Sequence, residues 1–259
     1  MKQITSARCI SCIPEVVPKK RSNNKKLKLL ITNKRIDWGF KQSMLMIQSR
    51  LQQIMRRTGD KVLLITSTIP AEGKTMTAVN MALAFAQEGM KVALLDGDLR
   101  KPSVCELMKL PEGPGLTEYF RGESTPEEIQ VVKDGVTFFR AGQKKGKVSG
   151  LIDEEKMNSL LEKLRKEYDV ILMDAAPSYV FSDAMILSSY ADKVLYVVRV
   201  DKADAKAIQV GMNSFEEKDK LIGYVINRDT GGYISQSRYG YGRSVSYTHL
   251  RAHETLANL

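Results

Sequence analysis

The stretch "KVLLITSTIPAEGKTMTAVNMALAFAQEG" (61–89) decides the fold. It opens with a short apolar run, residues 61–66, of the length that is typical of a buried strand. From residue 74 onward, apolar residues recur at helical spacing until Gly89, and glycine commonly ends a helix. The connection between the two is "STIPAEGKT" (67–75). We therefore predict a strand, a loop and a helix in direct succession.

The loop of this unit fits a phosphate-binding pattern. That pattern is G-x-x-x-x-G-K-[ST], and Gly73, Lys74 and Thr75 match it, while Thr68 stands in place of the first glycine. Backbone N–H groups of such a loop and of the helix N-terminus point at phosphates. Lys74 would supply a charge to the β and γ oxygens, and the Thr75 hydroxyl would ligate Mg²⁺. Because the triplet follows a strand and opens a helix, it indicates a nucleotide site.

Strands and helices continue to alternate on both sides of this unit. Apolar runs predict further strands at 91–96, 136–142, 169–174, 193–200 and 221–227. Helical spacing predicts further helices at 36–58, 154–168, 182–190 and 203–216. Alternating β and α units of this size form a mostly parallel sheet with helices on both faces. We expect an α/β domain at 36–228.

Acidic residues end two of the predicted strands. Asp96 and Asp98 stand in "LLDGDLRKP", and Asp174 stands in "VILMDAAP". Ligands of open α/β sheets bind outside the carboxyl ends of the strands, so these carboxylates should surround the phosphate loop. One carboxylate could hold the water shell of Mg²⁺ and another could accept a proton, as phosphoryl transfer requires.

Together, "STIPAEGKT", "LLDGDLRKP", "ILMDAAP" and a tyrosine-rich C-terminal segment resemble the bacterial tyrosine kinases that regulate capsule and exopolysaccharide synthesis. The resemblance covers about residues 38–244 and includes a D-x-D-x-R motif at Asp96, Asp98 and Arg100. It implies a P-loop NTPase fold of the deviant Walker type. It also implies an ATP-dependent protein-tyrosine kinase with Mg²⁺ as its metal.

The resemblance also assigns residues to roles. Lys74 and Thr75 would bind the phosphates and Mg²⁺, Asp98 and Asp174 would hold Mg²⁺ mainly through water, and Asp96 would be the base. The nucleotide-binding set would be Thr68, Pro70, Ala71, Glu72, Gly73, Lys74, Thr75, Met76, Arg100 and Asn227, the last of these at the adenine.

The C-terminal tyrosines have a role in this interpretation. Tyr233, Tyr239 and Tyr241 lie in the Gly- and Ser-rich run "GGYISQSRYGYG", within a predicted tail at 229–244. A flexible tail can reach the active site of a neighbouring copy, so these tyrosines are the expected phosphate acceptors. The segment "VSYTHLRAHET" (245–255) resembles one reading frame of a sequencing adapter. We therefore expect 245–259 to be non-native and set them aside.

The resemblance carries expectations about partners too. The chain looks like the split form of the family, which relies on a separate membrane protein that completes the nucleotide site and activates the kinase. A homo-oligomer with phosphorylation between copies is expected as well. The family's E-x-x-R-x-x-R assembly segment would align with Trp38, Lys41 and Met44, so that motif is lost here.

Charge is unevenly distributed along the chain. Residues 1–35 hold ten Lys or Arg and one acid, Glu15, and so contribute +9 of the net charge of +10. We expect a basic flexible arm there, either a solvated tail or a segment attracted to the anionic inner face of the cell membrane. No stretch approaches the roughly 18 apolar residues of a membrane span, and no secretory signal is evident. The expected location is cytoplasmic and peripheral to the membrane, with no nucleic-acid partner.

Two alternatives remain from the sequence. The deviant Walker ATPases of septum placement and plasmid partition share the expected fold, but Ile69 stands where their signature lysine would be. A nucleotide-binding regulator without kinase activity is the second alternative. The "CISC" of Cys9 and Cys12 lacks a second pair of ligands, so we expect neither a zinc site nor a redox motif.

Overall fold

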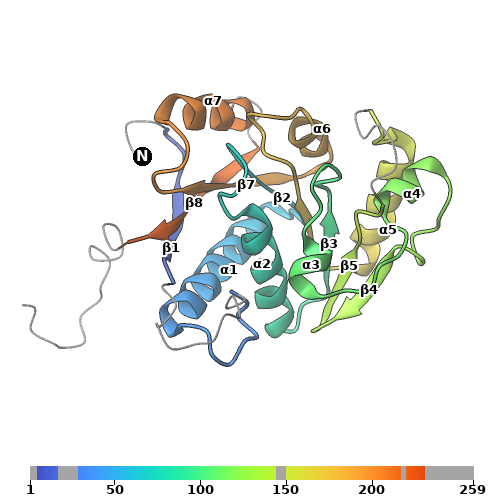
Figure 1. Ribbon diagram of the computed structural model, residues 1–259, viewed down its shortest axis with the longest axis horizontal. Helices are drawn as coiled ribbons and strands as arrows, with labels where there is room; N and C mark the ends of the chain where they lie inside the picture. The colour runs from blue at the N-terminus through green and yellow to red at the C-terminus, as the bar shows by residue number, and fades with distance from the viewer. Residues whose placement is uncertain (1–4, 17–28, 144–149, 217–219, 231–259) are drawn as a thin grey trace, which may run out of the picture.

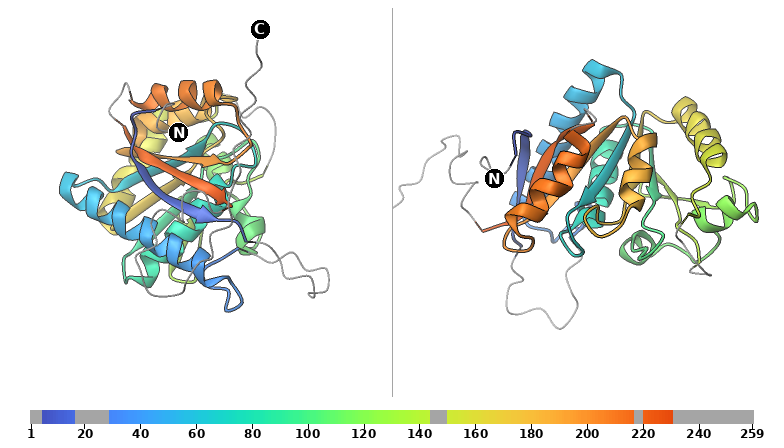
Figure 2. Two further views of the ribbon diagram at one scale, coloured as in Figure 1. Left: turned by 90° about the vertical axis from the view of Figure 1, so that its left-hand side faces the viewer. Right: turned by 90° about the horizontal axis from the view of Figure 1, so that it is seen from above.

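The computed structural model describes residues 5–16, 29–143, 150–216 and 220–230. Within these residues, eight strands form one twisted sheet with the order β1-β8-β7-β2-β6-β3-β5-β4 (Figures 1 and 2). The strands are β1 (Cys9–Pro14), β2 (Val62–Ser67), β3 (Val92–Asp96), β4 (Gln130–Lys133), β5 (Val136–Phe139), β6 (Val170–Asp174), β7 (Lys193–Arg199) and β8 (Leu221–Asp229). All neighbouring pairs are parallel except the β4–β5 hairpin.

Helices cover both faces of the sheet. They are α1 (Trp38–Thr58), α2 (Lys74–Gln87), α3 (Val104–Met108), α4 (Leu116–Arg121), α5 (Glu154–Glu167), α6 (Asp183–Tyr190) and α7 (Ala205–Glu216). One apolar cluster joins the sheet to α1, α2 and α3, and a second cluster joins the opposite face to α4, α5, α6 and α7. Strands β2, β3 and β6 are buried along their whole length, which explains their continuous apolar runs.

The long elements match the sequence prediction. The helices expected at 36–58 and 74–89 are α1 and α2, and the central strands agree to within about one residue at each end. The strand expected at 136–142 is shorter, because β5 ends at Phe139. Four short elements were not predicted, namely β1, α3, α4 and β4.

One expectation about the N-terminal arm is wrong. Residues Cys9–Pro14 are not a flexible arm: they form β1, which pairs in parallel with β8 at the edge of the sheet. Ile10 and Ile13 are completely buried against α1, and Ile31 is also buried. The many basic residues around these isoleucines obscured a short apolar segment that the sheet can bury. The rest of the expected arm, residues 1–4 and 17–28, lies outside the described residues.

No helix in the described part of the chain has the length and apolar character needed to cross a membrane. The predicted acceptors Tyr233, Tyr239 and Tyr241, together with the adapter-like segment at 245–259, lie outside the described residues.

The pairing of β1 with β8 depends on a glycine, which gives a first prediction. A Cβ atom at Gly223 would lie 2.4 Å from the backbone oxygen of Arg8. We expect Gly223→Ala to displace β1 and to lower the free energy of unfolding by more than about 2 kcal/mol, measured by chemical denaturation. Gly59→Ala is the control, because Gly59 also has positive φ but has open space around it, and it should cost about 1 kcal/mol. Equal losses in the two variants would contradict the prediction.

Candidate active site

Three parallel strands deliver the predicted site residues to one edge of the sheet. Strand β2 leads into the phosphate loop, and α2 begins at Lys74 immediately after it. Strands β3 and β6 are neighbours in register, so their last residues, Asp96 and Asp174, are paired across the sheet. Strand β6 also pairs with β2, so both carboxylates lie beside the loop.

Lys74 lies at the centre of a buried charged cluster. Its Nζ is 2.7 Å from Asp98 Oδ2 and 3.7 Å from Asp174 Oδ1. The Thr75 hydroxyl donates to Asp174 Oδ2 at 2.6 Å, and the Ser103 hydroxyl donates to Thr75 Oγ1 at 3.1 Å. The structure thus brings together four residues that the sequence proposed for phosphate and metal binding, and it adds Ser103, which sequence reasoning missed.

Burial and mutual repulsion shift the pKa values of this cluster. Burial, followed by the charge of Asp174, raises the pKa of Asp96 to about 8. Burial likewise raises the pKa of Asp174 to about 6, although Lys74 and Thr75 oppose the shift. Burial disfavours the charged form of Lys74, but the attraction of Asp174 and Asp98 outweighs it and raises the lysine pKa. The lysine is therefore cationic, and an additional positive charge would be stabilised beside the aspartates.

A buried glutamate holds the phosphate loop in place. The Glu72 side chain is completely buried, and its carboxylate accepts hydrogen bonds from the backbone N–H groups of Ile69 at 2.8 Å and Arg199 at 3.2 Å. The first of these bonds closes the loop on itself, and the second ties it to the end of β7. Burial raises the pKa of Glu72, and the backbone donors act against that rise.

Two further side chains form hydrogen bonds with the backbone of the same loop. Asn227 of β8 donates from Nδ2 to the Glu72 backbone oxygen at 2.7 Å, and a Cβ atom at Gly73 would lie only 2.1 Å from that Nδ2. Arg199 donates from Nη1 to the Ala71 backbone oxygen at 3.3 Å. Ala71 has φ of 67°, in the left-handed region that favours glycine. The contacts from β7 and β8 therefore stabilise a strained loop conformation.

The amide of Asn227 is engaged within the protein. Its Oδ1 accepts from the Arg228 N–H at 2.9 Å, while its Nδ2 bonds to Glu72. The contact with adenine that the resemblance implied stays a prediction. Thr68 and Glu72, which were also expected to touch the nucleotide, are buried behind the loop surface.

A cavity of about 480 Å³ opens above the charged cluster. It is lined by Pro70, Ala71, Gly73, Lys74, Thr75, Met76, Asp98, Arg100, Lys101, Ser103, Pro177 and Phe181. Eight of these twelve residues were proposed from the sequence, and the other four were not. Asp98 reaches the cavity wall, whereas Asp96 is completely buried below it.

Arg100 is fixed at the far side of the cavity. Its Nη2 donates to Asp183 Oδ1 at 3.2 Å and its Nε donates to the other carboxylate oxygen. The guanidinium also stacks over the Phe181 ring, 4.6 Å from the centroid, which is a cation–π contact. Asp183 and Phe181 were missed because they are 83 and 81 residues from Arg100 and belong to no motif.

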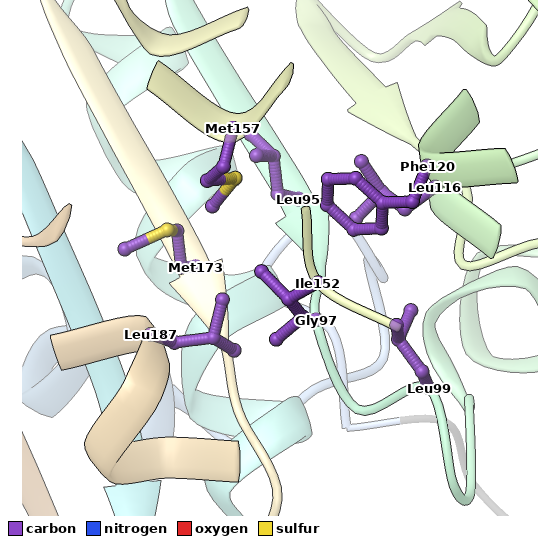
Figure 3. A pocket seen from close by; sticks show the side chains of 9 residues that line it. All are labelled: Leu95, Gly97, Leu99, Leu116, Phe120, Ile152, Met157, Met173 and Leu187. Atoms are coloured by element: carbon purple, nitrogen blue, oxygen red, sulfur yellow. The ribbon is translucent and has the colours of Figure 1, made fainter. Parts of the chain in front are cut away.

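An apolar cluster supports the segment that carries Asp96 and Asp98. Side chains from β3, α4, α5, β6 and α6 converge on a small cavity with no polar lining (Figure 3). Leu95 and Leu99 point into this cluster, while the two aspartates belong to the charged site. Gly97 lies between them, and a Cβ atom there would be 2.9 Å from both the Asp174 oxygen and Leu187 Cδ1. Tight packing therefore sets the position of the D-x-D segment.

The oxygen atoms around Lys74 fit a divalent cation. Asp96 Oδ1 and Asp174 Oδ1 are buried without a hydrogen-bond partner, which is unusual for a carboxylate. Across the described ranges, no group of three or more Asp, Glu, His or Cys side chains is placed to hold a metal alone. Mg²⁺ usually keeps several waters and binds one or two carboxylates plus substrate phosphates. Thr75, Asp98 and Asp174 are the residues that would hold it here.

Comparison with known proteins identifies the family. The ParA family model, described as NUBPL iron-transfer P-loop NTPase, matches residues 59–205. The tyrosine-protein kinase CpsD of Streptococcus pneumoniae is 32% identical over 199 residues, which cover 71% of this chain and 83% of that protein. The chain belongs to the bacterial tyrosine kinases. The tyrosine-protein kinase YwqD of Bacillus subtilis is 32% identical over 185 residues, covering 70% of this chain and 77% of that kinase.

Other members of the family are much longer. The putative tyrosine-protein kinase EpsB of Ralstonia nicotianae is 28% identical over 80% of this chain, but the match covers only 28% of EpsB. This chain therefore spans most of CpsD and YwqD and about a quarter of EpsB.

Solved structures show the same fold. The chimerical protein CapA2B2 matches 88% of this chain and 96% of its own, with a TM-score of 0.76 at 25% identity. The kinase domain of Escherichia coli tyrosine kinase ETK matches 93% of this chain and 95% of its own, with a TM-score of 0.78 at 24% identity. MinD of Pyrococcus horikoshii, complexed with Mg-ADP, has a TM-score of 0.54 at 22% identity and covers 65% of this chain and 70% of its own. The P-loop fold follows from these matches, and the matching P-loop NTPase family model supports nucleotide binding.

The strain at Ala71 gives a second prediction. Glycine adopts φ of 67° without the cost of about 1–2 kcal/mol that other residues incur in the left-handed region. Ala71→Gly should therefore raise the free energy of unfolding by up to about 1 kcal/mol and retain nucleotide binding. Ala86→Gly in α2 is the matched control, and it should lower stability by about 1 kcal/mol. Chemical denaturation checks both, and a loss of stability in Ala71→Gly comparable to that in Ala86→Gly would show that the loop is unstrained.

Proposed function

We propose that this chain is an ATP-dependent protein-tyrosine kinase that phosphorylates tyrosines of its own C-terminal cluster and regulates capsular or extracellular polysaccharide synthesis and export. The observation that carries the proposal is the buried cluster of Lys74, Thr75, Asp98 and Asp174 beneath an open cavity. Such a cluster combines a phosphate cradle, a cation and metal-binding oxygens, which are the parts that phosphoryl transfer needs. The names of the relatives, tyrosine-protein kinases that include one in a cps region, support the substrate and the pathway.

Each residue of the cluster has a proposed task. The phosphate loop and the N-terminus of α2 orient the triphosphate, and Lys74 neutralises charge that develops on the transferred phosphoryl group. Thr75 and Asp174 would hold Mg²⁺, which would supply positive charge to offset that of the phosphates. When substrate enters, Lys74 exchanges its contact with Asp98 for contacts with phosphate. Asp98 is then free to hold the metal's water shell.

Transfer also needs a proton acceptor for the tyrosine hydroxyl. The tyrosine Oη forms a bond to the γ phosphorus, the bond from γ phosphorus to the β–γ bridging oxygen breaks, and the hydroxyl proton leaves. Asp96 is the proposed acceptor, because its Oδ1 is buried at the end of β3 without a hydrogen-bond partner and is available to accept a proton. Asp96 lies below the cavity wall and Asp98 on it, so the proton would reach Asp96 past Asp98 or through water.

Acceptors and partners complete the proposal. Tyr233, Tyr239 and Tyr241 are the proposed acceptors, supplied to the site by a neighbouring copy of the chain. A membrane-anchored protein of the polysaccharide machinery is the proposed activator. The basic N-terminal residues would hold the kinase against the anionic inner face of the cell membrane.

A partition or septum-placement ATPase shares the fold, and the MinD structures support that alternative only at the level of fold. Ile69 stands where the signature lysine of those ATPases would be, and their expected function involves no tyrosine tail. A nucleotide-binding regulator without kinase activity would keep the same cavity. The formation of phosphotyrosine therefore decides between a kinase and such a regulator.

Phosphotyrosine mapping tests the proposal directly. The chain is incubated with Mg²⁺ and ATP and mapped by mass spectrometry, and phosphate is expected on Tyr233, Tyr239 or Tyr241. Lys74→Ala should lose this signal by at least about 100-fold, because the loop then lacks its cation. Lys166→Ala, at an exposed position of α5, is the matched control and should keep full activity. If no phosphate appears with the wild type, even with the activator's cytoplasmic segment present, the kinase assignment is wrong.

The acceptor assignment has its own test. A variant with Tyr233→Phe, Tyr239→Phe and Tyr241→Phe should lose most of its phosphotyrosine but bind ATP with unchanged affinity, because the nucleotide cavity is untouched. Undiminished phosphorylation in this variant would place the acceptors elsewhere in the chain.

The roles of the two aspartates can be separated in the same assay. Asp96→Asn should lower the transfer rate by about 100-fold or more while ATP affinity changes little, because it removes a base that lies outside the cavity. Asp98→Asn should weaken Mg²⁺-dependent nucleotide binding as well as transfer, because Asp98 lines the cavity. Nucleotide titration and single-turnover kinetics distinguish the two, and equal loss of nucleotide binding in both variants would argue against Asp96 as the base.

A further inference from the structure

Helix α1 has an unusual charge composition for a surface helix. Its 21 residues include Lys41, Arg50, Arg56 and Arg57 and no acidic residue. The inward face packs against the core, because Phe40, Met44, Ile47 and Leu51 are buried there. An ordinary solvated helix face mixes both signs of charge, whereas a helix with only cations on its polar side is typical of an anionic contact surface.

The outward face of α1 also carries exposed apolar residues. Trp38 is 75% exposed and Met46 is 49% exposed. They are separated by two helical turns, with exposed Gln42 between them, so all three share one stripe of the helix surface. Met46 lies beside β1, since the Ser11 hydroxyl approaches its sulfur at 3.9 Å. Trp38 is the only tryptophan in the chain, and the protein core does not use it.

Exposed cations precede the tryptophan in the chain. Lys34 and Arg35 are exposed in the turn that leads into α1, and Arg50, further along the helix, donates to the Ile10 backbone oxygen of β1. Two acids lie near the N-terminal end of α1. The Asp37 carboxylate caps the helix through the Phe40 N–H at 3.0 Å. Glu15 follows Pro14, which lies beside Gly39, and it pairs with Arg228 at 3.6 Å. The sequence up to residue 35 has a net charge of +9, while the remainder of the chain contributes only +1. Among the cations up to residue 35, Lys34 and Arg35 lie in the turn just before the exposed tryptophan.

We infer that the outward face of α1, with Trp38 at its N-terminal end, docks on an anionic lipid bilayer. Tryptophan prefers the interface between headgroups and acyl chains, and each Lys or Arg near an anionic surface adds attraction. A protein partner is the competing occupant, because Trp, Met and Arg are enriched at protein interfaces. The absence of any acidic residue from α1 favours the anionic lipid surface instead. The inference deepens the membrane attachment in the proposed function and assigns it to residues of the folded domain.

The single tryptophan supplies a direct readout with the intact chain. Its fluorescence is recorded with vesicles of phosphatidylcholine alone and with vesicles that contain phosphatidylglycerol. We expect a blue shift and reduced acrylamide quenching only with the anionic vesicles, and a loss of both at high salt. Binding itself is measured separately by cosedimentation of the same samples.

Matched variants test each half of the surface. Trp38→Ala should weaken cosedimentation with anionic vesicles by about tenfold. Val132→Ala is its control, because Val132 is 72% exposed on β4 at the opposite edge of the sheet, and it should have no effect. Lys34→Glu with Arg35→Glu should weaken binding by at least about thirtyfold. Lys166→Glu on α5, which covers the other face of the sheet, should change it much less.

Every outcome bears on the inference. Cosedimentation without a change in Trp38 fluorescence would mean that the basic segment binds alone, and the α1 face would be excluded. No cosedimentation would exclude the lipid surface altogether. A blue shift that depends on protein concentration without vesicles would assign the face to contacts between copies of the chain. None of these results affects phosphotyrosine formation, so failure of this inference is distinguishable from failure of the kinase assignment.

Discussion

The structure depends on the burial of Lys74 between two carboxylates. A buried ammonium group is costly unless it is paired, and Asp98 and Asp174 provide that pairing at 2.7 and 3.7 Å. The pairing requires that strands ending at different points of the sequence stop at the same level of the sheet. The in-register pairing of β3 with β6, and of β6 with β2, meets that requirement. The fully apolar strands and the helices on both faces bury Asp96 and Asp174 completely below the cavity.

The same constraint explains the contacts around the phosphate loop. The loop has to turn sharply between Ser67 and Lys74, and it does so with Ala71 in a left-handed conformation. A strained loop keeps one conformation only where its surroundings hold it. Here Glu72 bonds to the ends of the loop and of β7, and Asn227 packs on Gly73. Strand β8 therefore links the nucleotide site to the segment that carries the tyrosines.

The sequence was most informative where one segment contains a whole unit of structure. The strand, loop and helix of 61–89 were predicted because periodicity and motif agree within them, and the strand ends at Asp96 and Asp174 followed from the sheet rule. Contacts between distant segments could not be read in this way. Asp183 and Phe181 meet Arg100 only because α6 packs beside the β3 strand end, and Glu72 occupies a position that the phosphate-loop pattern leaves open. Strand β1 was missed because its two isoleucines lie among cysteines and basic residues.

The three positions of α1 that the resemblance aligns with the family's assembly motif differ in burial. Of the three aligned positions, Trp38 is exposed, Lys41 is half-buried and Met44 is completely buried in the core. An arginine at Met44 would place a charge among Ile47, Leu51 and the α2 side chains, where nothing pairs with it. Helix α1 therefore cannot present three charged residues at these positions as an assembly surface unless it rotates about its own axis relative to the sheet. Its exposed side instead carries Trp38 together with cations. Those cations lie on the exposed side because the apolar residues of α1 occupy the side that faces the core.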